Sequence, residues 1–488
     1  MTQPNVIITE LDGALGVLPS TAGKLTAFIG CSTGGPFNTP AAFARVPDLV
    51  ASFLDGELVE AAGSYIYTTG RPALVVRATA STAAAIGTIA LAMTGTSVVT
   101  AALDTLTKPA DDYELLVRFP TGGTVGTAGP VYQVSYDGGR NWEPSVALGT
   151  ANTITVGGVK FSLGVGTIVA GDMFAITAHA AQWGGTDLAA ALTGLGQSAV
   201  QWEQLSLVGV LTSATAGQVD AWCAGLRNSQ HKYRSWIGGA RLSTRDDPAS
   251  IETEAAYATS LAAQWAGFAT TRGTVAAGGC RLVSGVSGRQ YRRSAAWPIT
   301  NIQGDVSEEV NTADINLGAL PGVSIRDANG NVDEHDETIN PGLDDLGLAV
   351  LRTWDGYGGT YINRPLIKSA PGSDFTIIPF RRVMNLAEVI AYQYFVRRLN
   401  RPIRVDAATG YILETDALEI EAGANAVLRA GLRAAPKVSA VSFTLSRTDN
   451  ILSTKTLTGS IRLTPLAYPE EIDLDTSYFN PALAVKAA

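Results

Sequence analysis

The stretch "LRTWDGYGGTYINRPLI", residues 351–367, places three glycines among tyrosine, tryptophan and charged residues. Glycine-rich turns beside aromatic rings can hold phosphates or sugars, but glycines also let a chain reverse sharply. No general acid–base pair lies nearby in the sequence. We therefore expect Gly356, Gly358 and Gly359 to turn the chain after a helix over residues 340–354. We also expect three aromatic side chains to pack beneath the strand that follows: Trp354, Tyr357 and Tyr361.

The bulk composition indicates a large, multi-domain chain. Its 488 residues exceed one ordinary core, which predicts roughly two to four domains. Hydrophobic residues make up 46% of the chain, enough to fill large cores. Charged residues make up only 16%, against about 25% in a typical soluble protein. Much of the surface is therefore expected to be covered, by other domains or by other copies of the chain.

Charge and cysteine usage exclude several classes of protein. A net charge of −9 argues against a general nucleic-acid binder, which would present a basic face. The sequence starts without a secretory signal and contains no apolar run of about 18 residues, so we expect a soluble protein made in the cytosol, with no membrane insertion. Cys31, Cys223 and Cys280 form no C-x-x-C pair and are interpreted as core residues in a reducing compartment.

The first part of the chain is rich in predicted strands. Residues 5–11 and 24–30 read as strands, the second followed by a Gly-Gly-Pro turn, and residues 72–80 as a third. Residues 79–182 then become rich in Thr, Val, Gly and Ala, with short strands at regular spacing. Asp-Gly within residues 136–139 predicts a hairpin turn. This composition predicts an inserted β-sandwich or small barrel.

From about residue 183, predicted helices alternate with strands. Thr186 or Asp187 can cap the first of these helices. The predicted helices are 186–195, 215–229 and 248–269, and the predicted strands between them are 204–211 and 233–239. Such alternation favours a sheet covered by helices.

The last part combines a helix with a hairpin. Asn385 and Glu388 have capping-box spacing, which predicts a helix over 385–400. Residues 438–466 alternate and predict two long paired strands, followed by a polar tail. The expected fold class is thus α+β or mixed α/β and multi-domain: a helix-covered mixed sheet, an inserted all-β domain and extended terminal arms.

The sequence provides no recognisable catalytic set. It has three histidines, and no nucleophile elbow, phosphate-binding loop or dinucleotide fingerprint accompanies them. We therefore predict no enzymatic activity, no catalytic residues and no cofactor.

The segment 327–337, "DANGNVDEHDE", is the best metal candidate, because oxygen-bearing side chains alternate from Asp327 to Asp333 as in a calcium loop. An EF-hand loop would need Gly and Glu where Val332 and Thr338 stand. A solvated acidic turn built on Asn-Gly is favoured over calcium, so no metal site is predicted.

The order of these segments resembles that of tail sheath proteins from contractile phage tails and related injection systems. The resemblance rests on "VIITELDGALGVLP…LTAFIGCSTGGPFNTPAAFARVPDLVASFLDG", on "VSGRQYRRSAAWPITNI", and on the helix and glycine–aromatic turn of 351–367 followed by "RRVMNLAEVIAYQYFVRRL". It covers residues 1–78 and roughly 183–488, and leaves residues 79–182 outside. In that family the stretch 351–367 belongs to the core fold, which agrees with a structural role for its glycines.

The resemblance implies a mechanical function and a division of the chain. A sheath subunit stacks as hexameric rings around an inner tube and contracts to drive the tube through a bacterial envelope. The implied partners are other copies of the chain, the inner tube protein, the baseplate and the tail terminator, and the implied location is a virion tail assembled in the host cytoplasm. The division is an N-terminal arm with the first part of the core (1–78), the β insert (79–182), the α/β core (183–380) and a C-terminal domain with an arm (381–488).

The resemblance also implies interface residues. Sheath subunits are linked by terminal arms that add strands to their neighbours' sheets. On this basis we expect subunit contacts at these residues: Val6, Ile8, Glu10, Ile472 and Leu474. Either arm could instead fold back on its own domain. Arg397 and Arg398 at the end of the helix 385–400 are expected either to face the tube or only to complement the helix dipole.

Two other functions remain as alternatives. The chain could be a surface-binding protein or adhesin that uses the insert for recognition, because its "DGGRNW" turn is also common in carbohydrate-facing β domains. A glycan-active enzyme is the third hypothesis. The sequence does not separate a phage from a tailocin or an injection machine.

Overall fold

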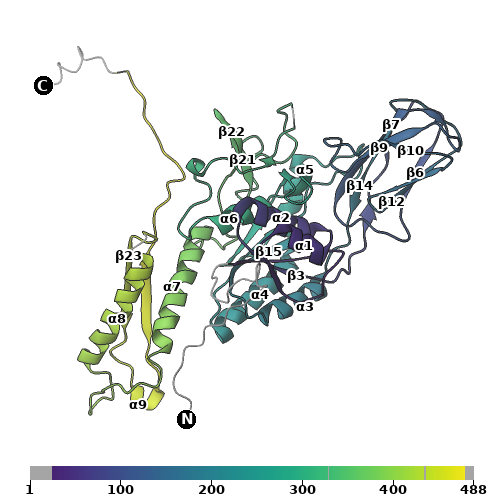
Figure 1. Cartoon of the computed structure of the whole chain (residues 1–488). Helices are drawn as coiled ribbons and strands as arrows, with labels where there is room; N and C mark the ends of the chain where they lie inside the picture. Colours follow the sequence, from purple (N-terminus) through teal and green to yellow (C-terminus); the bar gives the residue numbers. More distant parts are fainter. Residues whose placement is uncertain (1–24, 328, 434–435, 479–488) are drawn as a thin grey trace, which may run out of the picture. The chain divides into compact units, whose positions relative to one another are not determined.

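The computed structural model describes residues 25–327, 329–433 and 436–478 (Figure 1). Internal contacts divide the chain into two units, residues 1–399 and 400–488, which we describe separately. The predicted strand at residues 5–11 lies outside the described residues. The four-part division expected from the sequence stays a prediction.

A six-stranded sheet forms the centre of the first unit. Its strand order is β17-β16-β15-β1-β3-β2, and all neighbours are parallel except β2, which is antiparallel to β3. The central strand β1 is completely buried. The strands are β1 (Leu25–Gly30), β2 (Ala41–Phe43), β3 (Ala73–Arg77), β15 (Trp202–Val210), β16 (Ser235–Gly239) and β17 (Gly273–Ala276).

Helices cover both faces of this sheet because alternate strand residues point to opposite sides. Ala27 and Ile29 face one apolar core, whereas Phe28 faces the other. The first core is closed by α3 (Gly185–Gly196), α4 (Ser213–Gln230) and α5 (Glu254–Gln264). The second is closed by α1 (Val46–Phe53), α2 (Glu57–Thr69) and α6 (Ala296–Asp305). Figure 1 shows α3 and α4 on one side of the strands and α1 and α2 on the other.

Residues 79–182, which we call the insert, are all described and contain no helix. One antiparallel sheet has the order β10-β9-β7-β14-β4, with β5 also paired to β14, and a second has the order β11-β12-β6. Phe161 and Phe174, one from each sheet, lie 4.7 Å apart in a shared apolar core, so the two sheets pack face to face. The strands are β4 (Ala85–Ile86), β5 (Ala90–Ala92), β6 (Val99–Leu103), β7 (Tyr113–Thr121), β8 (Gly123–Thr124), β9 (Val131–Ser135), β10 (Val146–Ala147), β11 (Thr153–Val156), β12 (Val159–Leu163), β13 (Thr167–Ile168) and β14 (Met173–His179).

Smaller elements complete the first unit. A three-stranded sheet has the order β19-β18-β20, and β21 pairs with β22 as a hairpin. These elements are β18 (Gly279–Val283), β19 (Gln290–Ser294), β20 (Val323–Ser324), the 3₁₀ turn Ile315–Leu317, β21 (Leu351–Trp354), β22 (Tyr357–Ile362) and α7 (Ile378–Val396).

The second unit contains a long helix and a hairpin. Strands β23 (Ala440–Leu445) and β24 (Gly459–Thr464) pair antiparallel around the short helix α9 (Ile451–Thr454), as the alternation of residues 438–466 predicted. Helix α8 (Glu414–Leu432) packs on β23, and Asn425 exchanges hydrogen bonds with the backbone of Phe443 at 2.8 and 3.0 Å. The sequence analysis missed α8.

The helix expected over residues 340–354 is wrong. Gly342 and Gly347 have φ values of +136° and +71°, which interrupt a helix, and Leu351–Trp354 is strand β21. The backbone of Ala349 instead joins the edge of the central sheet: it donates to the Val275 carbonyl and accepts from Ala277, both at 2.9 Å.

The cap expected at Asn385 is also wrong. Helix α7 begins at Ile378 with Pro379 in its first turn, where a missing N–H costs nothing. Asn385 is buried inside the helix and accepts a hydrogen bond of 2.7 Å from Arg381 Nε.

Three smaller predictions need adjustment. Helix α3 begins after Gly184, and Asp187 in its first turn accepts from the Gly184 N–H at 2.8 Å. Helix α5 is shorter than predicted and is capped by Thr253. In the turn after β9, the positive φ values lie at Gly138 and Gly139, and β9 pairs with β10 across a longer loop than a hairpin turn.

Candidate functional site

The opening stretch forms a turn for which glycine is needed, but after a strand and not after a helix. Gly356 and Gly359 have φ values of +78° and +95°, in the region that favours glycine. Tyr361 is buried, as expected, whereas Trp354 and Tyr357 are 39% and 60% exposed, so the prediction that they pack beneath the next strand is wrong.

The acidic segment 327–337 has two different halves. Asp327 accepts hydrogen bonds from the backbone of Asn329 and Asn331, both at 2.8 Å, and this half is an exposed turn as predicted. The second half is not solvated: the side chains of Glu334 and Asp336 are 1% and 0% exposed. In the described parts of the chain, no group of three or more His, Cys, Asp or Glu side chains is arranged to hold a metal ion.

Asp333, in the same segment, belongs to an ionic network under the insert. Arg281 on β18 pairs with Asp333 at 2.7 Å and also with Glu114 on β7 of the insert. Arg245 binds the other Asp333 oxygen at 2.9 Å. Although burial alone would raise the pKa of Asp333, hydrogen bonds and charge from Arg281 and Arg245 hold that pKa at about 2. Asp333 is therefore ionised throughout the neutral range.

Further ion pairs connect the insert to the rest of the first unit. We call the boundary between these two parts the junction. Arg293 on β19 pairs with Asp111 of the insert, and their side chains are 3% and 2% exposed. Arg289 pairs with Glu143 of the insert at a more exposed place. A buried pair of this kind stabilises little by itself, but it strongly penalises any arrangement that leaves one partner alone. The junction therefore fixes the position of the insert relative to the rest of the first unit.

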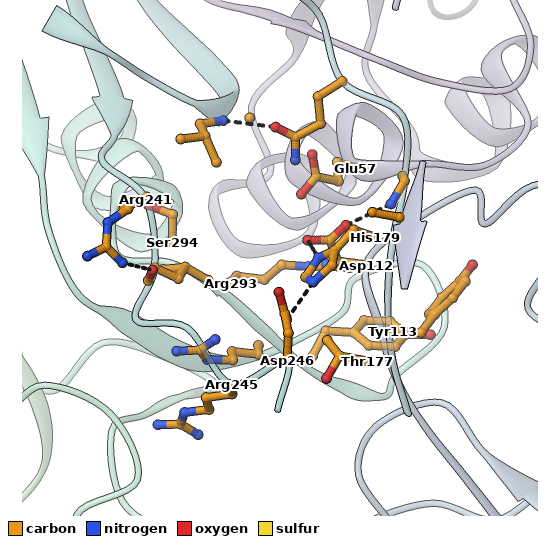
Figure 2. A pocket seen from close by; sticks show the side chains of 18 of the residues that line it. Glu57, Asp112, Tyr113, Thr177, His179, Arg241, Arg245, Asp246, Arg293 and Ser294 are labelled. Atoms are coloured by element: carbon orange, nitrogen blue, oxygen red, sulfur yellow. Dashed lines mark hydrogen bonds and ion pairs between the residues drawn. The ribbon is translucent and has the colours of Figure 1, made fainter. Parts of the chain in front are cut away.

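His179 at the end of β14 also connects the two sides of the junction. Its Nδ1 lies 3.1 Å from Asp112 in the insert, and its Nε2 lies 2.8 Å from Asp246 in the loop after β16 (Figure 2). The hydrogen bonds with Asp112 and Asp246 raise the pKa of His179 to about 10. The imidazole is thus charged at neutral pH and joins two carboxylates from opposite sides of the junction.

A cavity of about 350 Å³ lies beside His179 (Figure 2). Its wall comes from the insert, from the start of α2, from the ends of β15 and β16 and from β19. The residues include Glu57, Ala85, Val210, Arg241, Arg293 and Trp297.

The histidines are poorly placed for base catalysis. Burial alone would lower the pKa of His335, but hydrogen bonds with Glu254 and Glu337 raise it to about 9. His179 and His335 are therefore both protonated at neutral pH and are poor general bases. His231 stacks on the ring of Tyr392 at 4.6 Å.

The predicted interface residues are only partly within the described chain. Val6, Ile8 and Glu10 lie outside it. Ile472 and Leu474 are described, carry no regular secondary structure and are 73% and 79% exposed.

The two predicted tube-facing arginines follow α7. Arg397 caps the helix and is exposed, and Arg398 lies over the Tyr394 ring at 4.8 Å. Among the described residues, no helix has the length and apolar character needed to cross a membrane.

The sequence analysis missed the junction. Its two sides are visible in the sequence as "DDYE" at 111–114 and "RQYRRS" at 289–294. Each run separately looks like a solvated, charged surface, and nothing in the sequence pairs them across such a distance along the chain.

The fold is a mostly parallel, helix-covered sheet that carries an all-β insert after its strand β3, followed along the chain by a smaller helix-and-hairpin unit. Sheath proteins of contractile injection systems are the structural neighbours of this chain, so the resemblance identified from the sequence is confirmed at the level of the fold.

Three solved structures illustrate this likeness. A chain of the PVC extracellular contractile injection system, in its contracted sheath complex, matches with a TM-score of 0.52 and 10% identity over 98% of both chains. A chain of the anti-feeding prophage baseplate, 6-fold symmetrised, matches with 0.51 and 11% identity over 98% of this chain and 100% of its own. The contracted helical sheath of the same prophage matches with 0.50 and 11% identity over 98% and 99%. No family model and no curated protein matches the sequence.

Proposed function

We propose that this chain is the structural subunit of a contractile sheath. In this role it stacks with other copies as hexameric rings around an inner tube, and contraction of the stack drives the tube through a bacterial envelope. Its partners are other copies of itself, the tube protein, the baseplate and the tail terminator. The subunit is assembled in the bacterial cytoplasm, acts without enzymatic chemistry and becomes part of a phage tail or a related injection system.

The observation that carries this proposal is the extent of the structural match. The likeness covers 98% of this chain and 98 to 100% of the three neighbours. It therefore includes the central sheet, the insert and the smaller unit in one order, and it is not limited to a sheet type that many unrelated proteins share.

The exposed tail supports an arm that acts between subunits. Ile472 and Leu474 are two residues apart, so in an extended strand they lie on one face. Both are largely exposed in the isolated chain. Strand addition to a neighbour would bury this face and pair the backbone, each hydrogen bond contributing about 0.5–1.5 kcal/mol. Val6, Ile8 and Glu10 are proposed to do the same at the other end.

Negative-stain microscopy of the concentrated, purified protein tests the proposal. We expect hollow tubes. Deletion of residues 1–12, or the change Ile472→Asp with Leu474→Asp, should abolish tubes and leave the thermal unfolding of the monomer unchanged. Leu106→Asp is a matched control, because Leu106 is 92% exposed but lies in the insert. A protein that stays monomeric at every concentration would refute the proposal.

The arginines after α7 allow a separate test of tube contact. If Arg397 and Arg398 face acidic groups on the tube, their replacement by Glu should prevent co-assembly with the tube protein and leave monomer stability nearly unchanged. If they only complement the helix dipole, each contributes about 0.3–1 kcal/mol, and the monomer should lose stability while assembly persists.

A further inference from the structure

The cavity beside His179 lies at the place where open parallel sheets usually bind ligands. From β1 the chain proceeds to β3 on one side, whereas from β15 it proceeds to β16 on the other. The loops that leave the carboxyl ends of β1 and β15 therefore diverge, and such a switch point leaves a crevice outside the sheet. Val210 at the end of β15 and Asp246 after β16 line the cavity, and the insert covers it.

The charges on the cavity wall are compensated with one exception. The paired groups and their partners are Asp112 and Asp246 with His179, Glu114 with Arg281, Arg241 with Glu252, Arg245 with Asp333, Arg292 with Glu334, and Arg293 with Asp111. Within the described chain, Glu57 is the single charged side chain of the wall for which we find neither an ion pair nor a hydrogen bond to its carboxylate. Figure 2 shows it beside Asp112 and His179.

An uncompensated carboxylate in such a place is costly. Burial and the nearby charges of Asp112 and Asp111 together raise the pKa of Glu57 to about 8, although the charges of Arg293 and His179 act in the opposite direction. The Glu57 carboxylate must therefore either be protonated or pair with a cation.

We propose that the cavity binds a small organic cation, a protonated or quaternary amine with an apolar body, and that Glu57 is its counter-ion. The cavity volume lies in the range of small-molecule sites. The ring of Trp297 and the side chains of Ala85 and Val210 provide apolar wall for the body of such a ligand.

Other ligand classes fit the wall less well. An anion would find that the guanidinium groups of the wall already pair with carboxylates; these are Arg241, Arg245, Arg292 and Arg293. A bare divalent ion needs several oxygen ligands together, whereas Asp112 and Asp246 are held by His179. The site is independent of the proposed sheath role, because it is complete within one chain.

Calorimetric titration of the full-length monomer with benzyltrimethylammonium tests the site, since this probe keeps its charge at every pH. We expect saturable binding that strengthens about tenfold between about pH 7 and about pH 9, because the cation displaces the Glu57 proton. At about pH 7 binding should release a proton, which is measured by repeating the titration in buffers with different ionisation enthalpies. Benzyl alcohol and benzoate, the neutral and anionic controls, should bind at least tenfold more weakly.

Glu57→Gln should abolish this pH dependence and weaken binding of the probe at least tenfold at about pH 9. Glu60→Gln is the matched control, because Glu60 lies on the same helix, and burial raises its pKa too, but it does not line this cavity. The control should bind like the natural chain. Equal binding by the Glu57 variant, or no saturable binding at about 10 mM probe, would show that Glu57 simply retains its proton and would overturn the proposal.

Discussion

The central sheet and the junction beneath the insert are closed by side chains of opposite chemical character. The sheet is closed on both faces by aliphatic and aromatic side chains, with Trp236, Tyr65 and Phe28 almost completely buried. The junction is closed by arginines against carboxylates, with Arg293 and Asp111 as its most buried pair.

This difference suggests that one set of contacts stabilises the fold and the other determines the position of the insert. Apolar burial is roughly proportional to area and tolerates many arrangements, so the sheet accounts for most of the folding free energy. Charged pairs gain little net energy on burial but penalise every misalignment. We infer that the junction sets the position of the insert and that the central sheet stabilises the unit.

The largest effect should follow from a cavity in the sheet. Trp236 on β16 is 0% exposed, so Trp236→Ala should lower the free energy of unfolding by about 3–5 kcal/mol. Chemical denaturation followed by circular dichroism measures this loss. Leu106→Ala, at an exposed position of the insert, should change it by less than about 0.5 kcal/mol. Similar losses of unfolding free energy in the two variants would contradict the inference that the central sheet stabilises the unit.

The next effect should come from the buried pair of the junction. Arg293→Met leaves Asp111 buried without a counter-ion and should cost about 3 kcal/mol. The double variant with Asp111→Leu should recover most of that loss, because an apolar pair of similar volume replaces the charges. Arg45→Met, at the exposed pair with Asp48, should leave the free energy of unfolding nearly unchanged, because an exposed ion pair is screened by water and salt. A double variant as unstable as the single one would mean that the pair itself stabilises the unit.

The sequence predicted the sheet far better than the junction. Strands such as β1 and β15 are continuous apolar runs, and α3, α4 and α5 lie within or close to helices predicted from the sequence, so local pattern was enough to identify these elements, whereas α2 and α6 were not predicted. Local pattern failed where backbone partners are distant: the segment 340–354 looked helical, but its Ala349 pairs with β17. The junction could not be predicted for the same reason. Asp111 and Arg293 are far apart along the chain, and neither of the charged segments that contain them specifies its partner.

The site illustrates the limit of sequence patterns. Glu57 looks like an ordinary acid in the first turn of a helix, a position that the helix dipole favours. Among the described residues, Glu57 has no ion pair because the charged groups around it are paired with other residues, and only the structure shows those pairings.

The junction should also respond to pH, whereas the apolar cores should not. The pKa of His179 rises from 6.5 to about 10 in the folded chain, so its contribution to stability is complete below about pH 6.5 and is lost as pH rises through about 10. Glu57 acts in the same direction between about pH 4.5 and about pH 8, because the folded state keeps a proton that the unfolded state releases.

Urea unfolding at several pH values measures this dependence. The free energy of unfolding should fall between about pH 7 and about pH 10, and His179→Gln should remove part of the fall. His335→Gln is the matched control outside the junction, because the pKa of His335 is also raised, to about 9, by partners in the central unit. Hydrogen exchange should then locate the His179 effect at β14 and β4. An equal effect of both variants at β14 would contradict a role specific to the junction.

The smallest effect should come from the hairpin of residues 351–362, where a substitution alters neither apolar burial nor a charged pair. Gly356 and Gly358 both have open space around the position of a Cβ atom, but only Gly356 has a positive φ, +78°. Gly356→Ala should therefore cost about 1–2 kcal/mol through backbone strain alone, and Gly358→Ala should be close to neutral. Because space is equal at the two positions, the difference in unfolding free energy isolates backbone conformation. A difference below about 0.3 kcal/mol between the two variants would mean that the backbone at Gly356 does not require glycine, and would contradict the structural explanation.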